Sequence, residues 1–136
     1  MEEMIYKPGI SVVICCYNSA EVIELTIKAL ARQKVSSALN YEVILVDNNC
    51  TDHTVPLAEA VWEKENSPYP LRVVKESRSG LVYARKTGVF IASYDILLFA
   101  DDDNVLESDW VEKLADMYSR RPEVGGIGGY NRPLFE

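Results

Sequence analysis

The sequence lacks any long hydrophobic run, although 48% of its 136 residues are hydrophobic. A membrane-spanning helix needs about 20 consecutive apolar residues, whereas the apolar stretches here are only as long as a strand. No basic segment followed by an apolar core occurs near the N-terminus, so we expect no secretory signal and a cytoplasmic location. The length and composition predict a single domain over residues 1–136, large enough to close a hydrophobic core.

Basic charge is also scarce, because 14 Lys and Arg residues stand against 21 Asp and Glu residues, for a net charge of −7. Surfaces that bind nucleic acids hold phosphates with dense patches of Lys and Arg. The sequence therefore predicts no nucleic-acid partner. A small phosphate-bearing ligand remains compatible with this charge, since one cation and one or two arginines suffice to bind it.

Histidine and cysteine are too few for several common kinds of site. His53 is the only histidine, so a Ser-His-Asp triad would have to use it, and no neighbouring residue supports that. The three cysteines, Cys15, Cys16 and Cys50, are an odd number, which indicates reduced thiols. Adjacent residues of a strand point to opposite faces, so we interpret Cys15 and Cys16 as packing residues rather than joint metal ligands.

Apolar runs typical of strands alternate with segments whose apolar residues recur every three or four positions, as in helices. This alternation predicts βαβ units and a mostly parallel sheet. Right-handed crossovers then place helices on both faces, so the expected fold is a Rossmann-like, doubly wound, three-layer α/β/α domain. Asn18 is expected to cap the first helix, with Glu21 completing a capping box. The expected strands cover residues 10–16, 41–46, 71–75, 96–100 and 124–130, and the later helices begin after Thr51 or Asp52, Gly80, and the capping residue Ser108.

Three consecutive carboxylates, Asp101 to Asp103, directly follow the apolar run 96–100. That run is expected to be a buried strand, so the acids emerge at the edge where parallel α/β sheets bind ligands. Two unit charges about 4 Å apart repel by roughly 1 kcal/mol in water, and a divalent cation relieves this repulsion. Oxygen-only ligands favour Mg²⁺ or Mn²⁺. The alternative is an acidic turn that only ends the strand.

Other polar residues follow the remaining expected strands and should converge on the same edge. They provide an aromatic ring at Tyr17, an amide at Asn18, a carboxylate at Asp47 and a cation at Arg78, which together suit a nucleoside diphosphate. Arg85, one turn into a predicted helix, could reach a phosphate. The alternative is that turns are rich in Asn and Asp for backbone reasons, which does not account for the tyrosine, Arg78 or the acidic triplet.

Five motifs in this order and spacing resemble family 2 glycosyltransferases of the GT-A fold. They are SVVICCYN at residues 11–18, VDNNCTD at 46–52, Gly80 with Ala84 and Arg85, the triplet at 101–103, and Asp109 with Trp110. The resemblance implies inverting transfer of a sugar from a nucleotide-diphosphate donor, most simply a UDP-sugar, to a carbohydrate or lipid-linked acceptor. It also implies a Mg²⁺ or Mn²⁺ ion at the D-x-D motif.

Carried over to this sequence, the resemblance assigns candidate roles at the donor site. Asp103 matches the last acid of D-x-D and is the expected metal ligand, and Asp47 is expected to bind the base. The candidate residues for binding the nucleotide sugar are Cys16, Tyr17, Asn18, Asp47, Arg78, Arg85, Asp101 and Asp102.

Members of this family continue beyond the fifth strand with an acceptor site and a catalytic Asp or Glu. Inverting transfer needs a general base to take the proton of the acceptor hydroxyl. We therefore expect this base beyond Glu136, and we expect the chain to be a truncated donor-binding portion that transfers sugar slowly or not at all. Any membrane association of a longer protein would come from the later region.

Two other functions stay open at this point. A nucleotidyltransferase that makes sugar nucleotides would share the sheet and the carboxylates, but its first loop would be glycine-rich and basic, unlike Tyr17-Asn18-Ser19. A non-catalytic α/β nucleotide-binding or signalling module is the other alternative. A receiver-like module would carry its acids after the first and third strands, whereas the cluster here follows the fourth.

Overall fold

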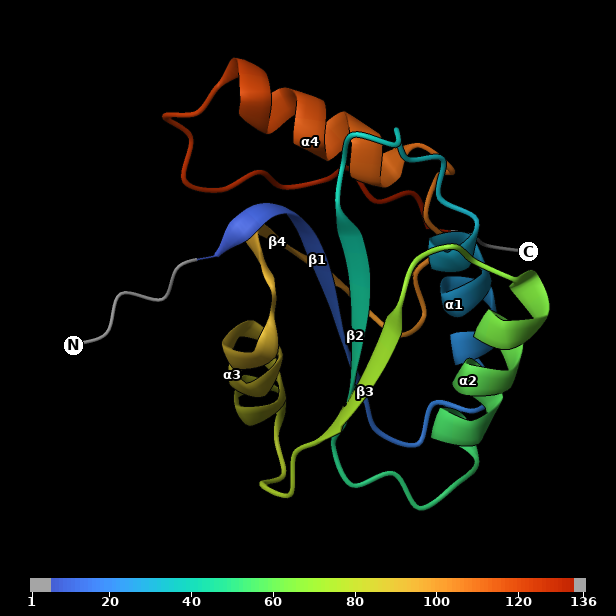
Figure 1. The fold of residues 1–136 in the computed structure, drawn as a ribbon. Helices are drawn as coiled ribbons and strands as arrows, with labels where there is room; N and C mark the ends of the chain where they lie inside the picture. The colour runs from blue at the N-terminus through green and yellow to red at the C-terminus, as the bar shows by residue number, and fades with distance from the viewer. Residues whose placement is uncertain (1–5, 134–136) are drawn as a thin grey trace.

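A four-stranded parallel sheet forms the centre of the computed structural model, which describes residues 6–133 (Figure 1). The strand order is β3-β2-β1-β4. Strands and helices alternate along the chain, as the sequence predicts. The elements are β1 (Lys7–Cys16), α1 (Ile23–Ala31), β2 (Tyr41–Asp47), α2 (Thr54–Glu65), β3 (Leu71–Lys75), α3 (Leu81–Ile91), β4 (Tyr94–Ala100) and α4 (Trp110–Arg120).

The strand order reverses between β1 and β4. The chain first builds the sheet outward from β1 through β2 to β3, and then returns to place β4 on the other side of β1. Cys16 is opposite Asp47, and Ile14 is opposite Ala100, so the four strands end at one edge. A ligand crevice is expected at the point where the order reverses, outside the carboxyl ends of the strands.

Helices cover both faces of the sheet (Figure 1). One face packs against α1, α2 and α4 in a core that includes Val12, Ile14 and Leu45. The other face, which includes Val13 and Ile44, packs against α3. Because neighbouring strand residues point to opposite faces, both faces of β1 and β2 are apolar and buried. No helix within residues 6–133 is long and apolar enough to cross a lipid bilayer.

Glycine allows α3 to lie very close to the sheet. A Cβ atom added to Gly88 would be 2.3 Å from Val13 Cγ1, well inside the usual carbon–carbon contact of roughly 3.5–4.0 Å. The helix can therefore take this position only if residue 88 has no side chain. This close packing fixes the distance between β1 and the helix that borders the ligand edge.

A buried acid joins the opposite end of the sheet to the segment between α3 and β4. Glu42 Oε1 accepts hydrogen bonds from Ser11 Oγ (2.7 Å) and from the backbone N–H of Ser93 (2.8 Å). Its other oxygen accepts one from Arg72 Nη1 (2.9 Å), and Arg72 also donates to the carbonyl of Ile91. Since Glu42 lies near the start of β2, this network stabilises the fold at a distance from the strand ends.

The expected fifth strand is wrong. Residues 124–133 form no helix or strand, and added Cβ atoms at the four glycines of this segment would have no neighbour within 4 Å. Glycine loses much conformational freedom on ordering and offers no side chain to pack, so this segment gains little by pairing. As a result β4 has no second strand partner in the described part of the chain. Phe99 is 46% exposed, and β4 is not the fully buried strand that its apolar sequence predicts.

Two expected helix caps are also wrong. Asn18 does not cap α1, which begins at Ile23, but adopts a positive φ of 47°. Its Oδ1 atom instead accepts hydrogen bonds from the backbone N–H groups of Thr51 (2.8 Å) and Asp52 (3.2 Å) in the loop after β2. The helix α4 starts after Asp109 without a side-chain cap, so Ser108 does not have its expected role. For Asn18, hydrogen bonds to a loop distant in the sequence replace the local helix cap that the sequence pattern predicts.

Candidate functional site

A crevice with a volume of about 360 Å³ opens where β1, β4 and the start of α3 meet. It lies at the point where the strand order reverses, as expected for this kind of sheet. Its size is within the range of about 300–1,000 Å³ for small-ligand sites. It is lined by Cys15, Cys16, Tyr17, Asn48, Leu81, Ala84, Asp101, Asp102 and Asp103.

Five of the residues expected at the site line this crevice together. Tyr17 is 65% exposed at the end of β1, so much of its side chain is available to a ligand. Cys16 lies directly before it, and the three aspartates come from the opposite side, after β4. Residues more than 80 positions apart in the sequence are therefore neighbours in one cavity.

The acidic triplet is held by contacts with α1 and its preceding loop. Ser19 Oγ donates a hydrogen bond to Asp102 Oδ2. Thr26 Oγ1 lies within hydrogen-bonding distance of the carbonyls of Asp102 (3.0 Å) and Asn104 (2.7 Å). Asp103 is exposed and accepts no hydrogen bond from any other residue within 6–133. The structure thus orients Asp102 and leaves the carboxylate of Asp103 free.

The triplet does not form a complete metal cage. Within residues 6–133, no group of three His, Cys, Asp or Glu side chains is arranged to hold one ion. Mg²⁺ commonly binds to one or two protein carboxylates and completes its coordination with water and substrate phosphates. The free carboxylate of Asp103, in a crevice that two further acids also line, fits an ion bound in that way. The donor set contains only oxygen, which suits Mg²⁺ or Mn²⁺.

Four other expected residues do not line the crevice, and Asp47 and Asn18 are two of them. Asp47 is buried at the end of β2, and its Oδ1 accepts a hydrogen bond from the backbone N–H of Cys50 (2.8 Å). Asn18 joins the loops after β1 and β2 from outside the cavity. The next residue after Asp47, Asn48, takes the position on the crevice wall instead.

Arg78 is the third residue outside the crevice. Its guanidinium forms an ion pair with Glu76 (Nη2–Oε2, 2.8 Å) and lies 4.8 Å from the centre of the Tyr83 ring. Glu76, which was not among the expected site residues, is buried. The only signal for it was its position directly after a strand, at the ligand edge.

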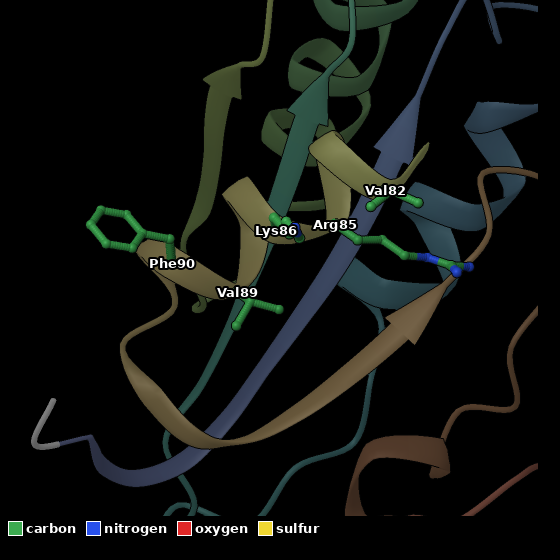
Figure 2. Close-up of a pocket in the computed structure, with 5 residues that line it drawn as sticks. All are labelled: Val82, Arg85, Lys86, Val89 and Phe90. Carbon is green, nitrogen blue, oxygen red and sulfur yellow. The ribbon is translucent and has the colours of Figure 1, made fainter. Parts of the chain in front are cut away.

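Arg85 is the fourth, and it lies on the outer side of α3. Figure 2 shows its side chain extended towards the end of β4, beside a hollow that Val82, Val89 and Phe90 also line. Its Nη2 atom is 3.9 Å from Asp101 Oδ1. Both groups are exposed, so this ion pair is weak. Arg85 is therefore a cation next to the acidic triplet rather than part of the cavity wall.

The cysteines near the crevice are protonated thiols. Burial raises the pKa of Cys15 to about 11, and burial is also the largest cause of the raised pKa values of Cys16 and Cys50. The Sγ atoms of Cys16 and Cys50 are 3.7 Å apart. Thiols are poor nucleophiles until they lose the proton. Cys16 and Cys15 pack into the cores on the two faces of the sheet, as the sequence predicts for this pair.

Comparisons with known proteins are consistent with this geometry. A model of the family described as Glycosyl transferase family 2 matches residues 11–135. A cholesterol galactosyltransferase of Borreliella burgdorferi is 29% identical over 114 residues, which are 84% of this chain and 30% of that protein. The chain thus spans less than a third of the length of this curated relative.

Two solved structures are similar as well. Staphylococcus aureus TarS 1–349 in complex with UDP has a TM-score of 0.74 at 22% identity, over 93% of this chain and 38% of that one. The mannosyltransferase PcManGT from Pyrobaculum calidifontis, in complex with GDP-Man and Mn²⁺, has a TM-score of 0.66 at 29% identity, over 81% and 31% of the two chains.

These matches confirm the resemblance and the expected GT-A fold, and they favour neither alternative function. The family model extends over nearly the whole described part of the chain, including every residue that lines the crevice. This chain therefore belongs to glycosyl transferase family 2.

Proposed function

We propose that the chain is the donor-binding part of an inverting, metal-dependent glycosyltransferase. The donor is a nucleotide-diphosphate sugar, with UDP as the first candidate nucleotide, and the acceptor is a hydroxyl of a carbohydrate or a lipid-linked sugar. The observation that carries this proposal is the one crevice lined by Tyr17 on one side and Asp101 to Asp103 on the other. Complexes of similar proteins with UDP, and with GDP-Man and Mn²⁺, support it.

Each side of the crevice has a separate role in this proposal. The exposed ring of Tyr17 stacks against the base, and Asp47, just behind the wall, uses its second carboxylate oxygen to select the base. Asp101 and Asp102 border the ribose, and Asp103 holds the metal ion. When bound, the ion stabilises the departing diphosphate. Arg85 is near enough to the triplet to exchange its weak pairing with Asp101 for a phosphate.

The acceptor side is assigned to a part of the protein outside residues 1–136. A carboxylate has to take the proton of the acceptor hydroxyl as that hydroxyl attacks the anomeric carbon. The acids that line the crevice are already assigned to the donor. The greater length of the curated relatives supports placing this general base, and the selectivity for the acceptor, in a further segment.

Thermal unfolding of the 136-residue chain tests the donor site. We expect Mn²⁺ with UDP to raise the melting temperature, since a ligand at 100 times its Kd stabilises a protein by about 2.7 kcal/mol. GDP and CDP are the comparison ligands. Asp103→Asn should remove the Mn²⁺-dependent part of the shift, whereas the control Asp116→Asn, an exposed acid on α4 that pairs with Arg120, should retain it.

Two results would contradict the proposal. The absence of a shift with every nucleotide would favour a domain that binds no donor. A shift of equal size with and without Mn²⁺, in both the original chain and Asp103→Asn, would refute the metal site while leaving nucleotide binding intact.

A further inference from the structure

The turn over residues 76–80 connects β3 to α3 along one side of the crevice, and Asn48 is bonded to it at three points. Asn48 Nδ2 donates to the carbonyls of Glu76 (2.9 Å) and Arg78 (2.7 Å), and its Oδ1 accepts from the backbone N–H of Gly80 (3.0 Å). All of these bonds come from the side chain that lines the crevice. The position of this wall therefore depends on the conformation of the turn.

The buried carboxylate of Glu76, which is only 6% exposed, accepts the hydrogen bonds that stabilise this turn. Its Oε1 accepts hydrogen bonds from Arg78 N (2.8 Å) and Nε (3.0 Å), and its Oε2 accepts from Arg78 Nη2 (2.8 Å) and from Thr87 Oγ1. Thr87 lies on α3. One carboxylate thus joins the backbone and the side chain of the turn to the body of the helix.

The charges in this turn neutralise one another. The hydrogen bonds from the Arg78 side chain, followed by those from Thr87 and from the Arg78 backbone, lower the pKa of Glu76 to about 2. The carboxylate is therefore ionised at neutral pH. Unpaired, it would repel a nearby diphosphate, but Arg78 compensates its charge. The same pairing means that Arg78 is not a free cation for a phosphate.

The turn also sets the start of α3. Gly80 has a φ of 127°, a conformation that side chains rarely allow, and the next residue, Leu81, lines the crevice together with Ala84. In Figure 1 the loops that follow β1, β2 and β3 all lie at the lower edge of the view, where the strands end. A shift of the turn would therefore move three wall residues together: Asn48, Leu81 and Ala84.

We infer that Glu76 is a positioning residue for a nucleoside-diphosphate ligand, and that it acts through the turn and Asn48 rather than by touching the ligand. This inference rests on the proposed donor site. The carboxylate keeps the wall formed by Asn48, Leu81 and Ala84 in place. Arg78 belongs to the same support, and its role is to neutralise Glu76.

The test compares Glu76→Gln with Glu42→Gln, a matched control. Both residues are buried acids paired with an arginine, but Glu42 lies near the start of β2 and far from the crevice. Glutamine retains the shape of the side chain, but its amide N–H group would face the guanidinium of Arg78. Two quantities are measured at 25 °C: the Kd of UDP with Mn²⁺ by calorimetry, and the hydrogen exchange of the Gly80 amide by NMR.

Glu76→Gln should raise the Kd of UDP about 10-fold, the equivalent of about one charge-assisted hydrogen bond. It should also speed hydrogen exchange of the Gly80 amide, which donates its hydrogen bond to Asn48 Oδ1. Glu42→Gln should change the Kd by less than 2-fold and leave Gly80 protected, even though the chain is less stable. Equal changes in Kd for the two variants would reduce Glu76 to a general structural role and overturn the inference.

The exchange measurement separates this inference from the proposed function. If the original chain binds no nucleotide, the donor site fails, and Gly80 exchange still decides whether Glu76 controls the turn. Unchanged protection of Gly80 in Glu76→Gln would refute the coupling between Glu76 and Asn48, whatever the affinity for UDP.

Discussion

Replacement of Gly88 by alanine should destabilise the chain, although alanine is the better helix former. The added methyl would lie 2.3 Å from Val13 Cγ1 and 3.2 Å from Val13 Cγ2. Val13 belongs to β1, which is flanked by β2 and β4 in the centre of the sheet. The strand cannot easily retreat, so α3 has to move outward.

The magnitude follows from two opposing effects. Alanine is favoured over glycine inside a helix by about 1 kcal/mol. An extra methyl in a close-packed core typically costs about 1–3 kcal/mol. The overlap at 2.3 Å is roughly 1 Å or more below an ordinary contact, which places this case at the upper end. We expect a net loss of about 2 kcal/mol and a melting temperature lower by roughly 6 °C.

A double-mutant cycle in urea separates steric overlap from other causes. Val13→Ala alone removes two buried methyl carbons and should cost about 2 kcal/mol. Combined with Gly88→Ala, it removes the two γ carbons that the new methyl meets and leaves only Val13 Cβ, at 3.3 Å. The remaining close contact offsets the helix preference of alanine, so the pair should cost about 2 kcal/mol instead of the additive sum of about 4. Additive losses, or a Gly88→Ala variant as stable as the original chain, would refute the steric explanation.

Three further predictions concern single side chains. Glu42→Ala should lower the free energy of unfolding by about 2–4 kcal/mol in urea, because it leaves buried donors without an acceptor. Burial alone raises the pKa of Glu42, but hydrogen bonds lower it overall. The loss of stability should therefore be full above pH ~4.5 and shrink at lower pH. Asn18→Ala should cost roughly 1–2 kcal/mol of unfolding free energy in the same assay, since alanine disfavours a positive φ and cannot accept the two backbone hydrogen bonds. Asn18→Gly should cost less, because glycine tolerates the positive φ. An equal loss in both variants would contradict the backbone contribution. Alkylation of Cys15 by iodoacetamide, followed by mass spectrometry, should accelerate about 10-fold per pH unit up to pH ~11, and a plateau near pH 8.5 would show that its pKa is not raised.

The alternation of strands and helices could be predicted from the sequence because the core elements carry strong periodic signals. In β1 and β2 both faces are buried, so continuous apolar runs mark them clearly. The segment 124–130 has apolar residues too, but its four glycines have no neighbouring atoms to pack against. A strand prediction there depended on a pairing partner that periodicity cannot supply.

The candidate site was predicted in part for the same reason. Residues that directly end a strand, such as Tyr17 and Asp101, are placed by the topology alone, and the structure brings them together. Arg78 and Arg85 have long side chains whose direction depends on their partners, which are Glu76 for one and Asp101 for the other. Glu76 is only two residues from Arg78, in a turn whose conformation periodicity does not reveal, and Asp101 lies 16 positions from Arg85, beyond β4. Neither pairing could be read from the sequence pattern.

Asparagine side chains join the three loops that follow β1, β2 and β3. Asn18 bonds the first loop to the second, and Asn48 and Asn49 bond the second loop to the turn at residues 76–80. A ligand that contacts these loops meets a surface that is already ordered. Less conformational entropy is lost on binding to such a surface, so a modest number of direct contacts can give useful affinity.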